Sequence, residues 1–308
     1  MALNDHDAWV PEEFGGPVIQ KIAAVSAVEA LARPENMNTD TRHVPRSGGI
    51  GLDVLDKGEP YTEDATSDDD VELRARKFGR MISLAHEDIE DVAEASAIDI
   101  VNVKKVDWAT TYAKGFDNAC LGTTATQSMG AKVPFYSVYY TLRNADSDLG
   151  YGADDNYVAS AAIEYSDLSE VLGLYEDGDW FDAAETVVIA SPAFKRIVRD
   201  VVDDNHRPIF IQGTQGTPDT LFGYQVAWTQ GARTSSSMTP APSGNPLLVV
   251  CNRQLLIKGV RSGPESYLAR ADSGIGFMTD EAYLKMRARR AFAVGHPKAF
   301  AVLESTAS

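Results

Sequence analysis

The chain has little positive charge and no long apolar run. Its 308 residues include 28 Lys and Arg against 45 Asp and Glu, so the formal net charge is −17. Binding nucleic acid by phosphate neutralisation needs clustered Lys and Arg, and this acidity argues against that function. No apolar run approaches the about 20 residues of a membrane span. The acidic start, MALNDHDAWVPEEF, lacks the apolar core of a signal peptide.

Cysteine is nearly absent. Cys120 and Cys251 are the two in the chain, and each lies among apolar neighbours. This setting favours buried free thiols over a disulfide, a nucleophile or a metal ligand. Together with the missing signal peptide, it predicts synthesis in a reducing cytoplasm.

Motifs for cofactor or metal chemistry are missing too. Gly49-Ile50-Gly51 lacks the third Gly of a dinucleotide fingerprint, and no Gly-Lys-Ser/Thr phosphate loop occurs. The groups His86–Asp88 and Asp203–His206 lack the ligand spacing of a structural metal site. The run Asp68–Asp70 lacks the Gly and closing Glu of a calcium loop. The sequence therefore predicts no catalytic, cofactor-binding or metal site.

What the chain does have is enough apolar content for a core and an uneven charge. Hydrophobic residues make up 44%, which argues against global disorder. The N-terminal third carries most of the excess of acid over base, with a local peak at Asp68–Asp70, while the segment from Arg253 onward leans basic. Identical copies with an acidic and a basic end can attract head to tail, as in a closed shell or ring.

The N-terminal segment reads as an arm. Met1–Pro17 is polar apart from Trp9 and Phe14, and it is either a frayed tail or an anchor for a neighbouring subunit. Val18–Ala32 has apolar residues at helical spacing, which predicts a short amphipathic helix.

A long hairpin is expected next. Thr41–Pro45 and Lys77–Leu84 read as strands, and the Gly- and Asp-rich stretch Gly48–Lys77 between them has no helical period. Structureless loops longer than about 15 residues are rare in compact domains. A projecting β-hairpin fits better, and because it is marginal alone it needs a partner surface.

The longest helix is predicted over His86–Gly122. The part Ile98–Leu121 alone is about 24 residues, or about 36 Å, which suggests a spine. After it, Val133–Leu142 is an aromatic, β-prone patch in a loop, and Asp155–Leu174 reads as a helix.

An α/β lobe is expected over residues 151–261. Glu185–Ala190 reads as a buried strand, and Ser191-Pro192 as the cap of a helix reaching about Val202. Leu221–Trp228 and Leu247–Val250 follow as strands. Tyr283–Val294 and Ala299–Leu303 are the last two strands, separated by Gly295-His296-Pro297.

This order resembles the major capsid proteins of tailed bacteriophages, the Hong Kong 97-like fold. Asp56–Tyr61 resembles the tip of the extended loop, Lys77–Asp91 the strand leading into the spine helix, and Asp117–Gly122 the end of that helix. Thr186–Arg199 and Leu221–Gly231 resemble axial-domain elements. The segment Pro246–Glu304 resembles the C-terminal β region.

The resemblance implies an α+β capsid fold in five parts. These are an N-terminal arm over 1–40, an extended hairpin loop over 41–85, and a peripheral domain with the spine helix over 86–150. An α/β axial domain over 151–261 and a return to the peripheral strands over 262–308 complete the chain.

It also implies a function and partners. The expected protein is a non-enzymatic major capsid protein, forming pentamers and hexamers in an icosahedral virion shell around double-stranded DNA, without sequence-specific DNA binding or a membrane. A separate scaffolding protein, a portal and a decoration protein are the expected partners. Candidate inter-subunit contacts are Trp9, Phe14, Lys57, Asp68, Asp69, Asp70, Arg287, Arg289 and Arg290.

Some relatives of this kind cross-link a loop Lys to an Asn of a neighbour. Lys57 lies near the Lys position, but no Asn follows Asn252, and Asp280-Glu281 stands about where the Asn would be. No isopeptide cross-link is therefore expected. Two alternatives stay open: an encapsulin-like shell around a cargo enzyme, and an acidic cytoplasmic α/β enzyme.

Overall fold

A computed structural model describes residues 25–48, 52–61, 63, 69–90, 99–125, 132–202, 207–213, 217–270 and 278–306. The chain forms two compact units. The described parts of the first unit fall in Gly79–Thr110 and Pro264–Arg287, and those of the second in Ala24–Phe78, Thr111–Gly263 and Ala288–Ser308. The α+β class expected from the resemblance is confirmed.

The helices are few and mostly short. They are α1 (Ala27–Leu31), α3 (Ile100–Leu121), α4 (Val138–Arg143), α5 (Tyr165–Glu176) and α6 (Phe194–Asp200), with 3₁₀ turns η2 (Ser147–Leu149) and η4 (Pro297–Ala299). The long helix predicted between 98 and 121 is α3, with 22 residues. At 1.5 Å per residue it is about 33 Å long.

The strands before residue 200 are β1 (Arg33–Asn36), β2 (Thr41–Arg46), β3 (Asp69–Arg74), β4 (Arg76–Ala85), β5 (Tyr157–Ser160) and β6 (Thr186–Ala190). Those after it are β7 (Phe210–Ile211), β8 (Thr220–Leu221), β9 (Tyr224–Trp228), β10 (Leu247–Asn252), β11 (Leu256–Ala269), β12 (Glu281–Val294) and β13 (Phe300–Ser305).

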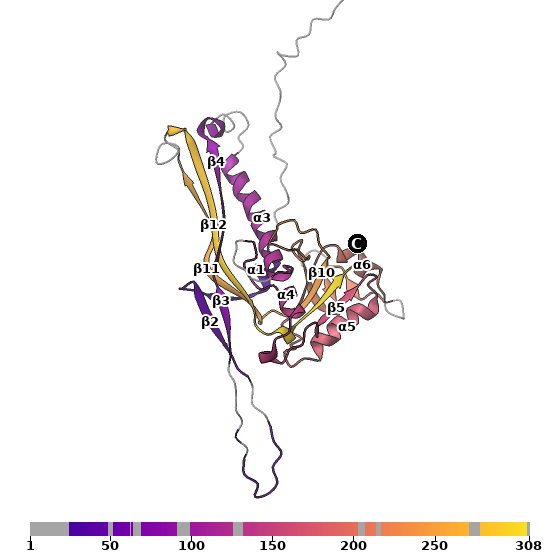
Figure 1. Cartoon of the computed structure of the whole chain (residues 1–308). Coiled ribbons are helices and arrows are strands. Elements are labelled where there is room, and N and C mark those ends of the chain that lie inside the picture. Colours follow the sequence, from indigo (N-terminus) through magenta and orange to yellow (C-terminus); the bar gives the residue numbers. More distant parts are fainter. Residues whose placement is uncertain are drawn as a thin grey trace, which may run out of the picture. The chain divides into compact units, whose positions relative to one another are not determined.

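A seven-stranded mixed sheet forms the core of the second unit, in the order β5-β13-β10-β6-β9-β8-β7. Its central strands β6, β10 and β13 are buried along their whole length, which explains their near-continuous apolar sequences. Alternate residues on one face contact α5 and α6 (Figure 1), while α4 packs on β13. The strand β13, which the predicted limits assign to the returning peripheral strands, pairs here with β10 and β5.

An aromatic cluster lies beside the last turns of α3. Tyr112 and Phe116 stack with ring centroids 5.8 Å apart, and Phe78 meets both rings edge-on. Phe135 contacts Phe116 at 6.0 Å and Phe292 at 6.1 Å. These contacts bring five aromatic residues from four separate stretches of sequence into one core.

Two helix predictions need correction. Asp155–Leu174 is not one helix: Tyr157–Ser160 joins the sheet edge as β5, parallel to β13, and the helix begins only at Tyr165. Pairing with β13 outweighs the helical pattern there. The predicted cap Ser191 does not cap α6, which begins at Phe194. The Ser191 hydroxyl is buried without a hydrogen-bond partner.

Two strand predictions also need correction. Residues 138–143 of the β-prone patch form α4, because the Ser137 hydroxyl accepts a hydrogen bond from the Tyr140 amide at 3.0 Å and caps the helix. The stretch Leu221–Trp228 is two strands, β8 and β9, joined by a two-residue turn. Phe222 and Gly223 occupy that turn with φ of 51° and 90°, the geometry of a tight hairpin.

Candidate assembly surfaces

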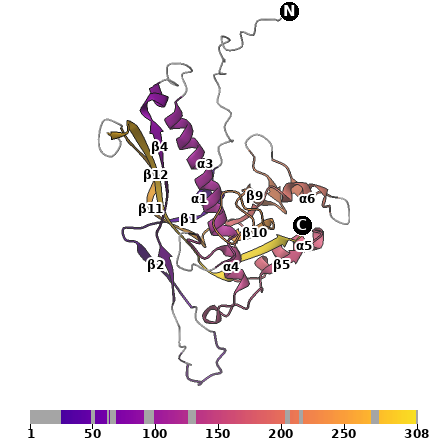
Figure 2. The ribbon, with the colours of Figure 1, turned by 45° about the horizontal axis from the view of Figure 1, so that its top comes forward.

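A hairpin is present at the base of the predicted loop, but its second strand is β3 and not the predicted Lys77–Leu84, which lies in β4. β2 pairs antiparallel with β3 from Thr41↔Arg74 to Arg46↔Asp69, and it lies at one end of the projecting segment in both views (Figures 1 and 2). At the open end of this ladder Arg46 forms an ion pair with Asp69. His43, which is opposite Glu72 in the ladder, contacts Asp70 two residues along β3. These contacts fix the two points from which the extended loop leaves.

The described part of the loop, Leu52–Tyr61, exposes apolar side chains. Leu52, Val54 and Tyr61 are 94%, 97% and 92% exposed. Single exposed apolar residues are ordinary on protein surfaces, but three in one ten-residue segment at such exposure indicate a contact surface for a partner.

The tip of the loop is a short turn. The Glu59 amide donates to the Asp56 carbonyl at 3.1 Å, and the Asp56 amide donates to the Glu59 carboxylate at 3.1 Å. Gly58 has a φ of +99°, a conformation that glycine adopts without steric cost. The turn holds Lys57 in an exposed position.

The arm is anchored through a buried carboxylate. Asp117 on α3 is 1% exposed and accepts hydrogen bonds from the Ser26 hydroxyl at 2.5 Å and the amides of Ala27 and Val28 at 3.0 and 3.1 Å. The Thr229 hydroxyl donates to it at 2.6 Å. Burial raises the pKa of Asp117, and these hydrogen bonds oppose that rise. One carboxylate thus joins α1, α3 and the loop after β9.

The side chain of Asn118, the next residue on α3, also links this helix to the loop after β9. Asn118 donates to the carbonyls of Gly231 and Arg233 at 3.1 and 2.9 Å, and it accepts from the Ser235 hydroxyl at 2.7 Å. Sequence reasoning placed Asp117 and Asn118 at the end of the spine helix but missed this role. Their position on an otherwise apolar helix face was the available signal.

The predicted basic cluster is divided among three internal ion pairs. Arg287 pairs with Glu265 at 3.0 Å, Arg289 with Asp40 at 2.5 Å, and Arg290 with Glu29 at 2.7 Å. Arg290 is 6% exposed. The acids Asp69 and Asp70 are also paired within the hairpin, so the described acidic and basic candidates are not brought together within one chain.

Several predicted groups cannot be placed. Trp9, Phe14 and Asp68, with Gly49–Gly51 and Asp203–His206, lie outside the described residues.

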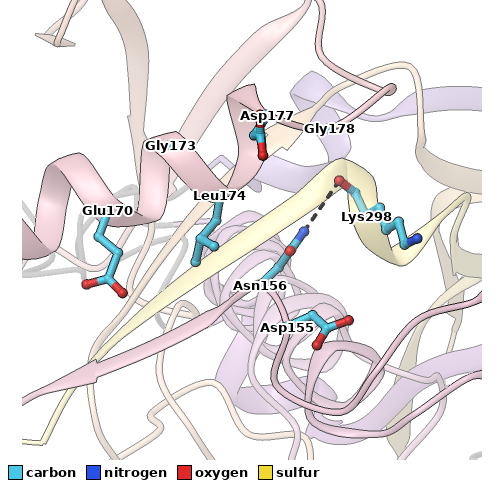
Figure 3. Close-up of a pocket in the computed structure, with 8 residues that line it drawn as sticks. All are labelled: Asp155, Asn156, Glu170, Gly173, Leu174, Asp177, Gly178 and Lys298. Carbon is cyan, nitrogen blue, oxygen red and sulfur yellow. Dashed lines mark hydrogen bonds between the residues drawn. The ribbon is translucent and has the colours of Figure 1, made fainter.

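The pocket in Figure 3 has no catalytic arrangement. About 430 Å³ in volume, it lies between α5, the start of β5 and η4. The Asn156 amide donates to the Lys298 carbonyl at 3.4 Å across one side. Its lining consists of Asp155, Asn156, Glu170, Gly173, Leu174, Asp177, Gly178 and Lys298. It offers carboxylates and one ammonium group, with no histidine, serine or cysteine as a nucleophile or base.

Other site types were sought in the described ranges. Within them, no group of three His, Cys, Asp or Glu is arranged to hold a metal ion, and no helix is long and apolar enough to cross a membrane. Both cysteines are buried and unbridged, and burial raises the pKa of Cys251 to about 12. His296, at the corner before β13, stacks on Trp180 with ring centroids 4.5 Å apart.

Comparison with known proteins identifies the class of structural protein to which this fold belongs. The model of the phage capsid family matches residues 7–305. The chain belongs to the phage capsid family, a family of structural proteins rather than enzymes, so the predicted resemblance is confirmed and the enzyme alternative is set aside.

Solved structures share the fold at low sequence identity. A chain from Mycobacterium phage Bobi is 15% identical with a TM-score of 0.71, over 98% of this chain and 97% of that one. One from Microbacterium phage Oxtober96 is 17% identical with a TM-score of 0.67, over 96% of each chain. The capsid of a native GTA particle is 15% identical with a TM-score of 0.68, over 99% of each. No curated protein matches the chain.

Proposed function

We propose that the chain is the major capsid protein of a tailed phage or of a GTA-like particle, and that it assembles as pentamers and hexamers into an icosahedral shell around double-stranded DNA. The observation that carries this is the loop Leu52–Tyr61, whose three large apolar side chains are more than nine-tenths exposed in the single chain. Such a segment is stabilised when a neighbouring copy covers it.

Assembly then follows from many modest contacts. The loop and the arm reach neighbours, and closure of the shell makes each subunit multivalent, so the shell is far more stable than any pair. The net charge of −17 gives an acidic wall that does not trap DNA. Among the described candidate contacts, Lys57, Asp69 and Asp70 are exposed, and Trp9 and Phe14 stay candidates from the sequence.

The further partners are a separate scaffolding protein, a portal and a decoration protein, and the subunit is made in the host cytoplasm before it enters the virion. The shell contacts DNA through no sequence-specific site, in keeping with the scarcity of Lys and Arg.

Negative-stain electron microscopy with light scattering on the same sample tests the proposal. Regular shells, tubes or hexamers are expected, alone or after co-expression with neighbouring structural genes. Small, uniform shells that are empty of DNA and hold a cargo protein would favour the encapsulin-like alternative. A monomer or dimer that persists in co-expression would overturn the proposal.

A further inference from the structure

Another pocket lies at the root of the extended loop, where β2 ends at Arg46 and β3 begins at Asp69. Its volume is about 460 Å³, within the range of small-molecule sites in proteins. The residues that line this root pocket include Arg46, Asp69, Asp148, Leu149, Trp180 and His296. They come from five separate stretches of sequence, and all belong to the second compact unit. The root pocket shares no lining residue with the pocket in Figure 3.

One wall of the root pocket is an aromatic pair. Trp180 and His296 stack with ring centroids 4.5 Å apart and an interplanar angle of 22°. The backbone of both residues is bonded to its surroundings: the Asn252 side-chain amide donates to the Trp180 carbonyl at 3.1 Å, and the Lys298 backbone amide donates to the His296 ring at 3.2 Å. Trp180 is only partly buried. An indole placed in this way offers the aromatic surface that binds cations best.

The basic residues of the root pocket do not supply free positive charge. Arg46 forms an ion pair with Asp69 and donates to the Gly295 carbonyl at 2.7 Å, so its guanidinium is already matched. Burial, followed by the charges of Arg46 and Lys298, lowers the pKa of His296 to about 4. The imidazole is therefore neutral at pH 7.

Asp148 supplies the charge that remains. Its carboxylate has no ion-pair or hydrogen-bond partner among the residues that the structure describes. Two further charges that act on His296, those of Asp146 and Lys298, are opposite in sign. Leu149 adds apolar surface beside the aromatic pair. One unmatched carboxylate next to aromatic and apolar side chains is the complement of a planar cation that carries a ring.

We propose that the root pocket binds a small aromatic amidinium or guanidinium compound. The cationic group pairs with Asp148, and the ring packs against the Trp180–His296 pair. Ser47 and Gly48, the two residues that follow β2, also line the pocket, so a bound ligand restrains the extended loop at its root. The inference goes beyond the proposed function and does not depend on it, because the whole site lies within one chain.

Isothermal titration calorimetry with benzamidine, which carries one amidinium on one ring, tests the proposal at pH 7. Benzamide has nearly the same shape without the charge and should bind more weakly by about tenfold or more. Asp148→Asn should weaken benzamidine binding by a similar factor. The matched control is Asp177→Asn, which removes a carboxylate from the pocket in Figure 3 and should leave binding unchanged. Absence of benzamidine binding, or equal losses from the two variants, would overturn the proposal.

Hydrogen exchange of the wild-type chain covers the case in which a variant fails to fold. Benzamidine should slow exchange in the peptide that covers Val44–Gly48 and leave α5 unchanged. Slowed exchange in α5 alone would place the ligand in the pocket of Figure 3 and refute the root pocket. Failure of the chain to form any shell would refute the capsid function without altering this result.

A capped arginine, N-acetyl-arginine methylamide, separates a small ligand from a protein partner. It carries the same type of cation on a flexible chain without a ring, so it should bind more weakly than benzamidine. Tighter binding of the capped arginine would overturn the proposal, because an arginine side chain of another protein would then be the better occupant.

Discussion

At the scale of single residues, buried carboxylates without a cation hold distant segments together. Asp117 accepts four hydrogen bonds from α1 and the loop after β9. Glu304 accepts from two tyrosine hydroxyls and from the Asn245 amide at 2.6 Å. A buried carboxylate is tolerated only when its oxygen atoms accept hydrogen bonds. Each of these two carboxylates therefore links the segments that supply its donors.

Asp117→Ala is expected to loosen the arm. The substitution leaves two hydroxyls and two backbone amides without an acceptor, and the free energy of unfolding should fall by about 3 kcal/mol or more. Hydrogen exchange at the Ala27 and Val28 amides should speed up most, because these amides lose their acceptor. The exposed Asp177→Ala serves as control and should change stability by less than about 0.5 kcal/mol. Unchanged exchange in α1 would contradict the anchoring role.

His296 should make stability depend on pH. Burial, with the nearby charges of Arg46 and Lys298, lowers the pKa of His296 to about 4 from an ordinary 6.5. Between these values the unfolded chain binds a proton that the native chain does not, so stability falls as pH drops from about 6.5 toward 4. The loss attributable to this residue is up to about 3 kcal/mol.

The measurement is urea unfolding at pH 7 and pH 4.5 for the wild type and for His296→Asn. The asparagine keeps an acceptor for the Lys298 amide, which donates to the histidine ring at 3.2 Å, but it does not titrate. Its stability should vary less with pH. An equal pH slope in both proteins would show that His296 is not responsible, and His43→Asn, at an exposed residue, controls for the loss of a histidine.

At the scale of elements, the sequence allowed prediction of those with strong local signals. The α3 spine, the strand β2 and the buried strands β6 and β10 have clear periods or apolar runs. One error fell where a distant partner decides, since β5 is a strand because β13 lies beside it. The other concerned α4, where the local cap Ser137 favours a helix over the β-prone composition. The four hydrogen bonds to Asp117 join stretches far apart in the sequence, and no residue spacing predicts them.

Substitution of two helix-associated glycines, Gly122 and Gly173, by alanine should change stability in opposite directions. A Cβ on Gly122, at the end of α3, would lie 2.0 Å from the Arg233 carbonyl oxygen. Gly122→Ala must push two backbone segments apart, at a cost of about 2–4 kcal/mol. A Cβ on Gly173 in α5 meets nothing within 4 Å, so Gly173→Ala should stabilise by about 0.5–1 kcal/mol. Thermal unfolding of both variants is the measurement, and shifts of the same sign would contradict the packing at Gly122.

At the scale of the whole molecule, the described arginines of β12 are used for internal pairing, while one long stretch of the chain is acidic without any base of its own. Twelve Asp and Glu residues and no Lys or Arg lie between Asn144 and Phe194. We therefore expect contacts between copies to depend on apolar surfaces such as the loop and on the arm, rather than on a broad basic face.

Covalent linkage is not expected to reinforce these contacts. An isopeptide bond from Lys57 to an asparagine releases ammonia, and no Asn follows Asn252. Assembled particles boiled in SDS should run as a single 33.3 kDa band. A ladder of covalent multimers would contradict this expectation, and Lys57→Arg would show whether Lys57 forms the links.

Without cross-links, we expect the arm to supply part of the stability of the shell. Deleting Met1–Pro17 removes Trp9 and Phe14 but keeps Ser26–Val28 and their bonds to Asp117, so the subunit should remain folded with an unchanged melting temperature. Shells should become unstable, because each subunit loses an aromatic contact that is repeated throughout the particle. Full-length Trp9→Ala/Phe14→Ala separates the aromatic anchors from chain length and should show most of the same loss. Normal particles from both variants, counted by electron microscopy after dilution, would mean that the loop contacts alone hold the shell together.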